Sequence, residues 1–188
     1  EDTRNMTIFL DFRPVWGNVS LARMLWYHIF QAFRNPEKMN HMLTQEDLRF
    51  DIPIGFFGQI TPGKTDSDKH EIDLKKGGLV HLINGARIFA VNSKISETST
   101  LGRLRQLRGL KIIPSKDAGY FIRAFETLIL MRIRTNLEKI RLGQEPDNRM
   151  DPSGLPPEET KLLTNALLSV SFMQKLIRSR FTQIALNF

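Results

Sequence analysis

Two long segments in the second half of the chain carry apolar residues at helical spacing, and they constrain the fold more than any other feature. We expect the first helix to begin at Ser115 or Asp117 and to run to Ile140, with Gly143 as its natural end. The second segment repeats apolar residues every three or four positions, with one longer step before the last: Leu163, Ala166, Val170, Met173, Ile177 and Ile184. Such stripes pack helix against helix, so the sequence predicts a mainly α-helical bundle.

Shorter helices are expected earlier in the chain. Asn18 is a favoured N-cap residue, and apolar residues follow it at helical spacing up to Phe33; a second helix is expected over 37–50. A further helix, capped by Thr98 or Ser99 and ended by Gly109, carries leucines on one face. Its other face is predicted to expose three arginines: Arg103, Arg105 and Arg108.

The N-terminal run from Met6 to Phe12 is apolar and rich in β-prone residues, and it is closed by Pro14 and Gly17. It predicts one strand, which needs sheet partners that the rest of the sequence does not supply. We therefore expect a missing N-terminal part, with residues 1–17 as the end of that domain and residues 18–188 as a helical domain. Asp11, in the middle of the run, either faces solvent or serves as a metal ligand.

Charge points to an anionic partner. The 188 residues carry a formal net charge of +7, with a pI near 9.9, which suits a nucleotide, a nucleic acid or an acidic protein. The chain has no cysteine, no apolar run long enough to span a membrane and no signal peptide, so we predict a cytoplasmic protein without membrane contact.

A glycine pair at Gly77 and Gly78 follows a short extended run from His70 and precedes a helical pattern. Glycines allow a ligand to approach the backbone closely, and the amides of a following helix favour phosphate, as do the neighbouring Lys75 and Lys76. The alternative is a plain glycine turn with solvated lysines.

Residues 58–65 match the phosphate-loop pattern G-x-x-x-x-G-K-[ST], but their context does not. Pro53 and Gly55 interrupt the run before it, and the polar residues after Thr65 have no apolar helical face. We interpret this match as a coincidence, since an ATPase would need a helix directly after Thr65.

Two motifs together resemble the nucleotidyltransferase substrate-binding domain family. They are Ile72-Asp73-Leu74-Lys75-Lys76-Gly77-Gly78-Leu79, followed by Gly85-Ala86-Arg87, and Gly143-Gln144-Glu145-Pro146-Asp147-Asn148-Arg149-Met150-Asp151-Pro152. The first is also similar to a region of the bacterial uridylyltransferase that modifies the nitrogen-regulatory signalling protein. The family resemblance implies a helical domain that follows a polymerase-beta-like nucleotidyltransferase domain, often behind cyclic-nucleotide-binding and CBS modules, in bacterial signal transduction.

The resemblance also implies site residues. Leu10-Asp11-Phe12 fits the third catalytic carboxylate of such transferases, which makes Asp11 a catalytic and metal-binding residue for Mg2+ in the full-length protein. The nucleotide- and substrate-binding residues implied are Asp73, Lys75, Lys76, Gly77, Gly78, Arg87, Asn148 and Arg149. Two of these have structural alternatives, because Arg87 can pair with a carboxylate in the bundle and residues 147–149 can simply fasten a turn.

The function expected from these observations is binding of nucleotide and acceptor for metal-dependent nucleotidyl transfer. A single carboxylate cannot organise two metal ions, so we expect the chain to be inactive alone. Its expected partners are a nucleoside triphosphate, an acceptor that can be a protein, and the missing transferase and regulatory domains; nucleic acid is less favoured. The alternative is a non-catalytic regulatory or interaction module that binds an acidic protein or nucleic acid.

Overall fold

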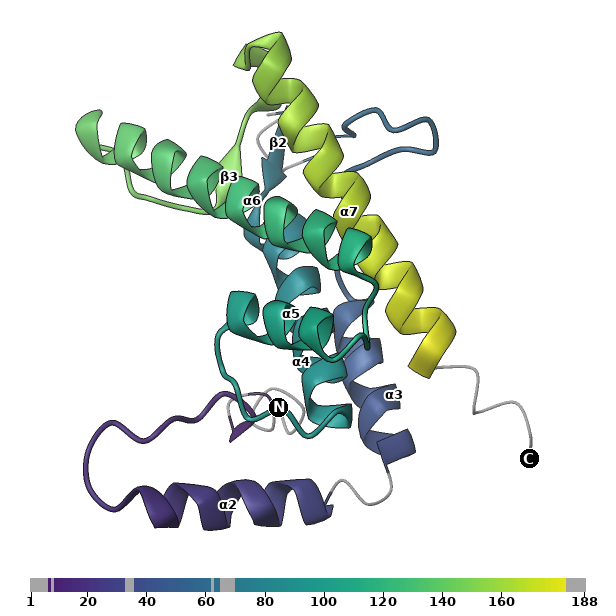
Figure 1. Cartoon of the computed structure of the whole chain (residues 1–188). Coiled ribbons are helices and arrows are strands. Elements are labelled where there is room, and N and C mark those ends of the chain that lie inside the picture. The colour runs from purple at the N-terminus through teal and green to yellow at the C-terminus, as the bar shows by residue number, and fades with distance from the viewer. Residues whose placement is uncertain (1–6, 8, 33–35, 62, 65–69, 182–188) are drawn as a thin grey trace. The chain divides into compact units, whose positions relative to one another are not determined.

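The computed structural model describes residues 7, 9–32, 36–61, 63–64 and 70–181. They form two compact units. Unit 1 comprises Glu1–Arg49, Ile83–Ala118 and Leu176–Phe188, and unit 2 comprises Phe50–Leu82 and Gly119–Lys175. The predicted mainly α-helical class is confirmed (Figure 1). Within the described residues, no helix combines the length and the apolar character that crossing a membrane requires.

Unit 1 contains the shorter helices that the sequence predicts. Its elements are α2 (Val19–Ala32), α3 (Pro36–Asp47), most of α4 (Val80–Asn92) and α5 (Thr100–Gly109). Asn18 caps α2, since its Oδ1 accepts the amide of Ser20 at 2.9 Å. Ser99 caps α5 by accepting the amide of Gly102 at 3.1 Å. Both caps satisfy amides that lack a partner within the helix.

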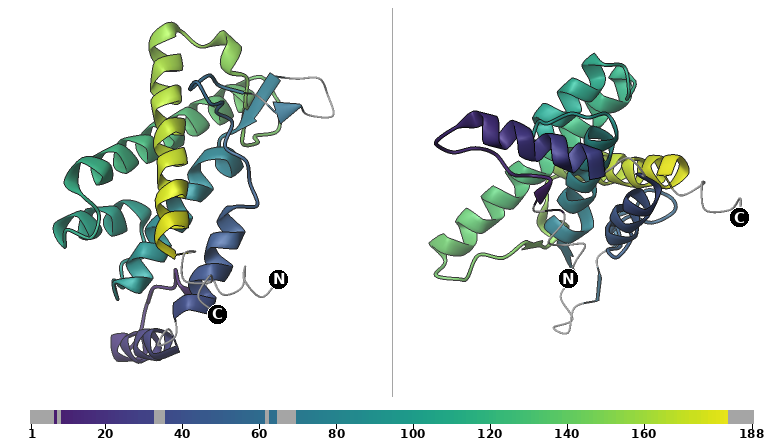
Figure 2. Two further views of the ribbon diagram at one scale, coloured as in Figure 1. Left: turned by 90° about the vertical axis from the view of Figure 1, so that its right-hand side faces the viewer. Right: turned by 90° about the horizontal axis from the view of Figure 1, so that it is seen from below.

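Helix α2 lies along one edge of unit 1 (Figure 1; Figure 2, left view). Its inner face holds Trp26 between Phe12 and Phe30, with ring centroids 4.8 and 5.2 Å away. Its outer face leaves Leu21 and Met24 more than half exposed. The helix is therefore apolar on both faces. From helical periodicity alone, such a helix would be expected to be buried.

The predicted N-terminal strand is wrong for the residues that the structure describes. Thr7 and Phe9 are helical, and Leu10 and Asp11 form a turn; Met6 and Ile8 lie outside the described residues. The physical reason is tertiary: Leu10 is 1% exposed, and its carbonyl oxygen accepts a hydrogen bond from Arg103 instead of joining a strand. The assignment of residues 1–17 to another domain stays a prediction.

The two long helices of unit 2 confirm the bundle prediction. Helix α6 runs over Ser115–Arg141 and α7 over Pro157–Phe181, and residues 119–175 of this region belong to unit 2. Gly143 ends α6 with a φ of 70°, while the amide of Gln144 donates to the carbonyl of Lys139 at 2.8 Å. The buried stripe consists of Phe121, Leu128, Leu163, Ala166, Val170 and Met173. Ile184 lies outside the described residues.

A small antiparallel sheet completes unit 2. Its strands are β1 (Gly63–Lys64), β2 (His70–Asp73) and β3 (Arg149–Met150), with β2 in the middle. Ile72 pairs with Met150 and Asp73 with Arg149, and Figures 1 and 2 show β2 and β3 side by side. A 3₁₀ turn, Pro152–Gly154, leads from β3 toward α7. Thus the sheet brings two segments together that are more than seventy residues apart in the sequence.

The phosphate-loop match does not form the strand-loop-helix unit that such a loop needs, as far as the structure describes it. Gly63 and Lys64 are in β1, and His70 starts β2; Pro62 and residues 65–69, which include Thr65, lie outside the described residues.

Candidate functional site

A pocket of about 450 Å3 in unit 2 brings together four of the eight residues predicted to bind nucleotide or substrate. The four are Asp73, Lys76, Gly77 and Arg149. The irregular segment after α3 contributes Phe50, Asp51, Ile52, Pro53 and Thr61 to the lining. Strand β2 adds Glu71 and Ile72. Every lining residue belongs to unit 2.

The helix that follows β2 begins with a π-helical turn, Lys75–Leu79, and continues as α4. Hydrogen bonds that span five residues define this turn: Leu79 donates to the carbonyl of Leu74 at 3.0 Å, and Val80 donates to Lys75. The predicted order of strand, glycine pair and helix is thus correct. However, the glycines lie inside the first helical turn and not in a loop before it. Single π-turns of this kind are frequently found at functional sites.

Asp73 occupies the start of this helix. Its Oδ1 accepts the amide of Lys75 at 2.9 Å and the amide of Lys76 at 2.7 Å. The sequence-based hypothesis offers the amides around Gly77 and Gly78 to phosphate, whereas the carboxylate of Asp73 satisfies the two amides that precede them. Asp73 therefore caps the first turn of the helix and leaves the amides of Lys75 and Lys76 unable to bind phosphate.

The two glycines allow close packing. A Cβ at position 77 would lie 2.7 Å from Cδ of Pro53 and 3.3 Å from the carbonyl oxygen of Asp51. A Cβ at position 78 would lie 2.9 Å from Cδ1 of Leu128 on α6. Both contacts are too short, so each glycine lets the turn approach a neighbouring segment. Gly77 contributes to the pocket floor for this reason, and Gly78 lies on the side that faces α6.

Two cations and three carboxylates give the pocket a mixed electrostatic character. Lys76 Nζ lies 6.0 Å from the centroid of the Phe50 ring, and Arg149 stands across the β2–β3 ladder from Asp73. The other acids in the lining are Asp51 and Glu71. Lys75 is exposed and is not part of the lining, although it neighbours Lys76 in the sequence. The pocket thus offers cations for phosphate and carboxylates for hydroxyl or amino groups.

The turn at residues 147–149 is fastened by its own hydrogen bonds. Asp147 Oδ1 accepts the amide of Arg149 at 2.8 Å and pairs with Lys139 Nζ at 2.5 Å. Partial burial acts to raise the pKa of Asp147, but the hydrogen bond from Lys139 and the amide of Arg149 outweigh it and lower that pKa. Asn148 Oδ1 accepts from Arg132 Nε at 2.7 Å, and Asn148 is not in the pocket lining. The structural alternative therefore accounts for the contacts of Asp147 and Asn148.

Asp11 and Arg87, also predicted as site residues, meet in unit 1. Arg87 Nη2 lies 2.5 Å from Asp11 Oδ2, and Arg103 Nη1 lies 2.7 Å from Asp11 Oδ1. Arg103 also donates to the carbonyl oxygens of Leu10 at 2.9 Å and Glu97 at 2.6 Å. Although burial acts to raise the pKa of Asp11, Arg87 and then Arg103 hold that pKa below its usual value. Arg103 is 1% exposed, so its predicted place on the polar face of α5 is wrong.

The described residues do not fit a magnesium site. Both oxygens of Asp11 contact guanidinium groups, and a carboxylate held by two cations is a poor ligand for a third. Among the residues that the structure describes, no group of three or more His, Cys, Asp or Glu side chains could hold a metal ion. Mg2+ and a metal-binding role for Asp11 stay predictions about the full-length protein.

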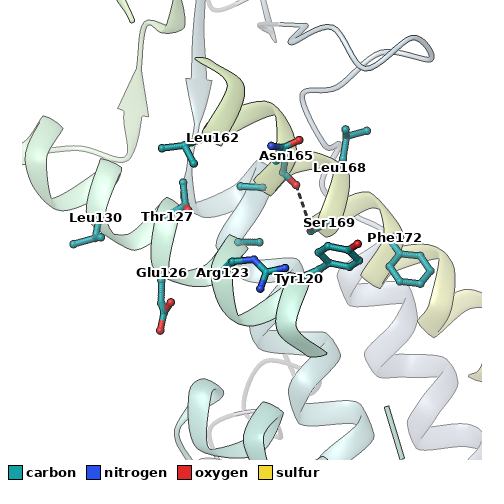
Figure 3. Close-up of a pocket in the computed structure, with 12 residues that line it drawn as sticks. Tyr120, Arg123, Glu126, Thr127, Leu130, Leu162, Asn165, Leu168, Ser169 and Phe172 are labelled. Carbon is teal, nitrogen blue, oxygen red and sulfur yellow. Dashed lines mark hydrogen bonds between the residues drawn. The ribbon is translucent and has the colours of Figure 1, made fainter. Parts of the chain in front are cut away.

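A second cavity, which the sequence did not predict, lies in unit 2 between α6 and α7 (Figure 3). Its volume is about 720 Å3, and its lining residues all fall within 119–175. Leu130 and Leu162, two of these residues, are 66% and 53% exposed. Neither residue belongs to the apolar stripes that we assigned to the bundle core, so the only available signal was an apolar surface wider than one helix contact needs.

The sequence also did not lead us to predict three residues of the first pocket: Glu71, Phe50 and Asp51. Glu71 had a signal, because strand alternation places it on the same face as Asp73. Phe50 and Asp51 had none, since they reach the pocket only through the fold of an irregular segment.

Comparison with known proteins adds one match. No curated protein and no solved structure matches this chain. Residues 37–181 match one protein family over more than three quarters of the chain. This range contains the pocket, the π-turn and both long helices. The chain therefore belongs to the family described as "Putative nucleotidyltransferase substrate binding domain".

Proposed function

We propose that this chain is the substrate-binding part of a nucleotidyltransferase and that the 450 Å3 pocket of unit 2 binds the nucleoside triphosphate. The family assignment supports the substrate-binding role. We choose this pocket because Asp73, Lys76, Gly77 and Arg149 line one cavity. They come from two segments of the chain, and the β2–β3 pairing is what joins them.

The chemistry of the lining suits the parts of a nucleotide. Lys76 and Arg149 are the cations at the pocket, and phosphate oxygens are their natural partners. The ring of Phe50 offers a surface on which a base can stack. Asp51 and Glu71 can accept hydrogen bonds from ribose hydroxyls or from exocyclic amino groups. The volume of about 450 Å3 falls within the range of small-molecule sites.

Catalysis in this proposal belongs to a transferase domain that supplies the metal-binding carboxylates. The proposal also includes Mg2+, the acceptor, a role in bacterial signal transduction beside CBS modules and a cytoplasmic location. They follow from the family resemblance and from composition, and this chain alone is expected to bind without turnover.

Two neighbouring lysines make a matched test. Lys76→Ala removes a pocket cation, while Lys75→Ala removes an exposed lysine outside the pocket. Binding of ATP, GTP, CTP and UTP to the 188-residue chain would be measured by calorimetry, with each variant checked by circular dichroism. We expect Lys76→Ala and Arg149→Ala to weaken the preferred nucleotide about five- to tenfold, and Lys75→Ala to change it less than twofold.

Equal losses in the two lysine variants would contradict the pocket assignment, because a general electrostatic attraction would then explain binding. Absence of binding for all four nucleotides would also refute it. Binding of duplex DNA that weakens steeply with salt, with no competition by nucleotides, would instead support the interaction-module alternative.

A further inference from the structure

The groove between α6 and α7 in unit 2 is the feature that the nucleotide proposal leaves unexplained (Figure 3). We propose that it is a second binding site, for an amphipathic anion that combines an elongated apolar body with one carboxylate or phosphate group. The proposal rests on the cavity, its walls and one cation, and it does not depend on the nucleotide pocket.

The walls of the groove are apolar and remain accessible. On α6 they include Leu130, which is 66% exposed. On α7 they include Leu162, Leu168 and Phe172, which are 53%, 45% and 38% exposed. Exposed apolar surface of this kind, gathered in one cavity, typically marks a binding site. The apolar body of a ligand would displace water from these side chains and gain the corresponding hydrophobic free energy.

The dimensions suit an elongated ligand. The lining on α6 runs from Tyr120 to Leu130, and the lining on α7 runs from Leu162 to Phe172. Ten residues of α-helix rise about 15 Å, so both walls extend over about that length. The cavity volume of about 720 Å3 lies within the range of small-molecule sites. A medium-length acyl chain fits such a trough better than a compact polar metabolite does.

One cation defines the head-group end. The Arg123 guanidinium lies over the ring of Tyr120, 5.2 Å from its centroid, and both residues line the groove. Within the part of the chain that the structure describes, Arg123 forms no ion pair with a carboxylate. Glu126 also lines the groove, one turn along α6, but its carboxylate points away from Asn165 and Ser169 in Figure 3. Arg123 is therefore the cation that lies beside the apolar walls, and its guanidinium favours an anionic head group.

Decanoate and decanol form a matched pair of probes, because they share the apolar chain and differ in charge. Binding of each to the 188-residue chain would be measured by calorimetry below the micelle concentration. We expect saturable binding of decanoate with a Kd below about 1 mM, and weaker binding of decanol. Arg123→Gln should weaken decanoate about three- to tenfold and leave decanol within twofold. Lys175→Gln, an exposed lysine on α7 outside the groove, is the charge control.

A second pair of variants tests the apolar wall without relying on Arg123. Leu130→Asp places a carboxylate inside the groove, while Leu137→Asp makes the same change at a 51% exposed position of α6 outside it. The first should weaken both probes at least fivefold, and the second should leave both within twofold. Three results would overturn the proposal: no saturable binding of either probe, equal losses for decanoate and decanol in Arg123→Gln, or a dimer of the chain that Leu130→Asp dissociates. The last would mean that a second copy occupies the groove.

Discussion

Replacing Arg103 by methionine tests whether the buried ionic cluster holds unit 1 together. The side chain of Arg103 is 1% exposed and contacts Asp11 at 2.7 Å and the carbonyl oxygens of Leu10 and Glu97 at 2.9 and 2.6 Å. Methionine keeps most of the volume, so the loss is one of two hydrogen bonds and one ion pair. Hydrogen bonds to charged groups contribute about 1.5–3 kcal/mol each. Relief from burying a charge offsets part of the loss of three contacts, and Arg87 still pairs with Asp11.

We therefore expect a net loss of about 3 kcal/mol in the free energy of unfolding of unit 1. With a urea dependence of about 2 kcal/mol per molar, the unfolding midpoint would fall by roughly 1.5 M. Both tryptophans of the chain, Trp16 and Trp26, belong to unit 1, and Trp26 is stacked between two phenylalanines. Tryptophan fluorescence therefore reports on this unit. Arg105→Met, at an exposed position of the same helix, is the control. Free energies of unfolding for the two variants that agree within about 0.5 kcal/mol would refute the reasoning.

Three further predictions follow from the geometry. Asp11→Asn should destabilise unit 1 less at pH 3 than at pH 7: the folded pKa of Asp11 is lowered, so its contribution is fully present above the unfolded pKa of about 4 and declines as the pH falls toward the folded pKa; an equal destabilisation at both pH values would contradict this. Gly77→Ala should cost about 1–3 kcal/mol in thermal unfolding, because its Cβ would lie 2.7 Å from Pro53, whereas Gly154→Ala, with open space, should cost less than about 0.5 kcal/mol. Ser99→Ala should cost about 1 kcal/mol in urea unfolding through loss of the α5 cap, and an unchanged midpoint would count against that cap.

Helices with one apolar stripe and a clear end could be predicted from the sequence. The caps at Asn18 and Ser99 and the end of α6 at Gly143 were all identified correctly, since they depend on interactions within a few residues. The later apolar positions of α6 were not placed correctly. Ile133 and Leu137 follow helical spacing, yet both are 51% exposed.

Long-range contacts explain what the sequence could not predict. Arg103 and Arg108 flank the Leu104–Leu107 stripe of α5 at equal angles, so periodicity cannot distinguish the buried arginine from the exposed one. The choice depends on Asp11, more than ninety residues away in the sequence. The conformation of the β-prone run around Asp11 likewise depends on its long-range contacts, which favour a turn over a strand.

For the candidate site, motif reasoning found the segments but not the role of each residue. Asp73, Lys76 and Arg149 do lie in one pocket. Asp73, which motif reasoning assigned to ligand binding, instead accepts the amides of Lys75 and Lys76, and these two hydrogen bonds depend on its side-chain torsion. The sequence alone does not determine that torsion.

The π-turn over Lys75–Leu79 holds one more residue than an ordinary helical turn. The number of residues in this turn therefore affects which side chains face the pocket. Successive residues of a helix are about 100° apart around its axis. Deleting one glycine would let the turn become regular and would change the direction of Lys76 relative to Leu79, while α4 continued unaltered beyond it. Deletion of one residue would therefore change which side chains face a ligand and would leave the rest of the helix as it is.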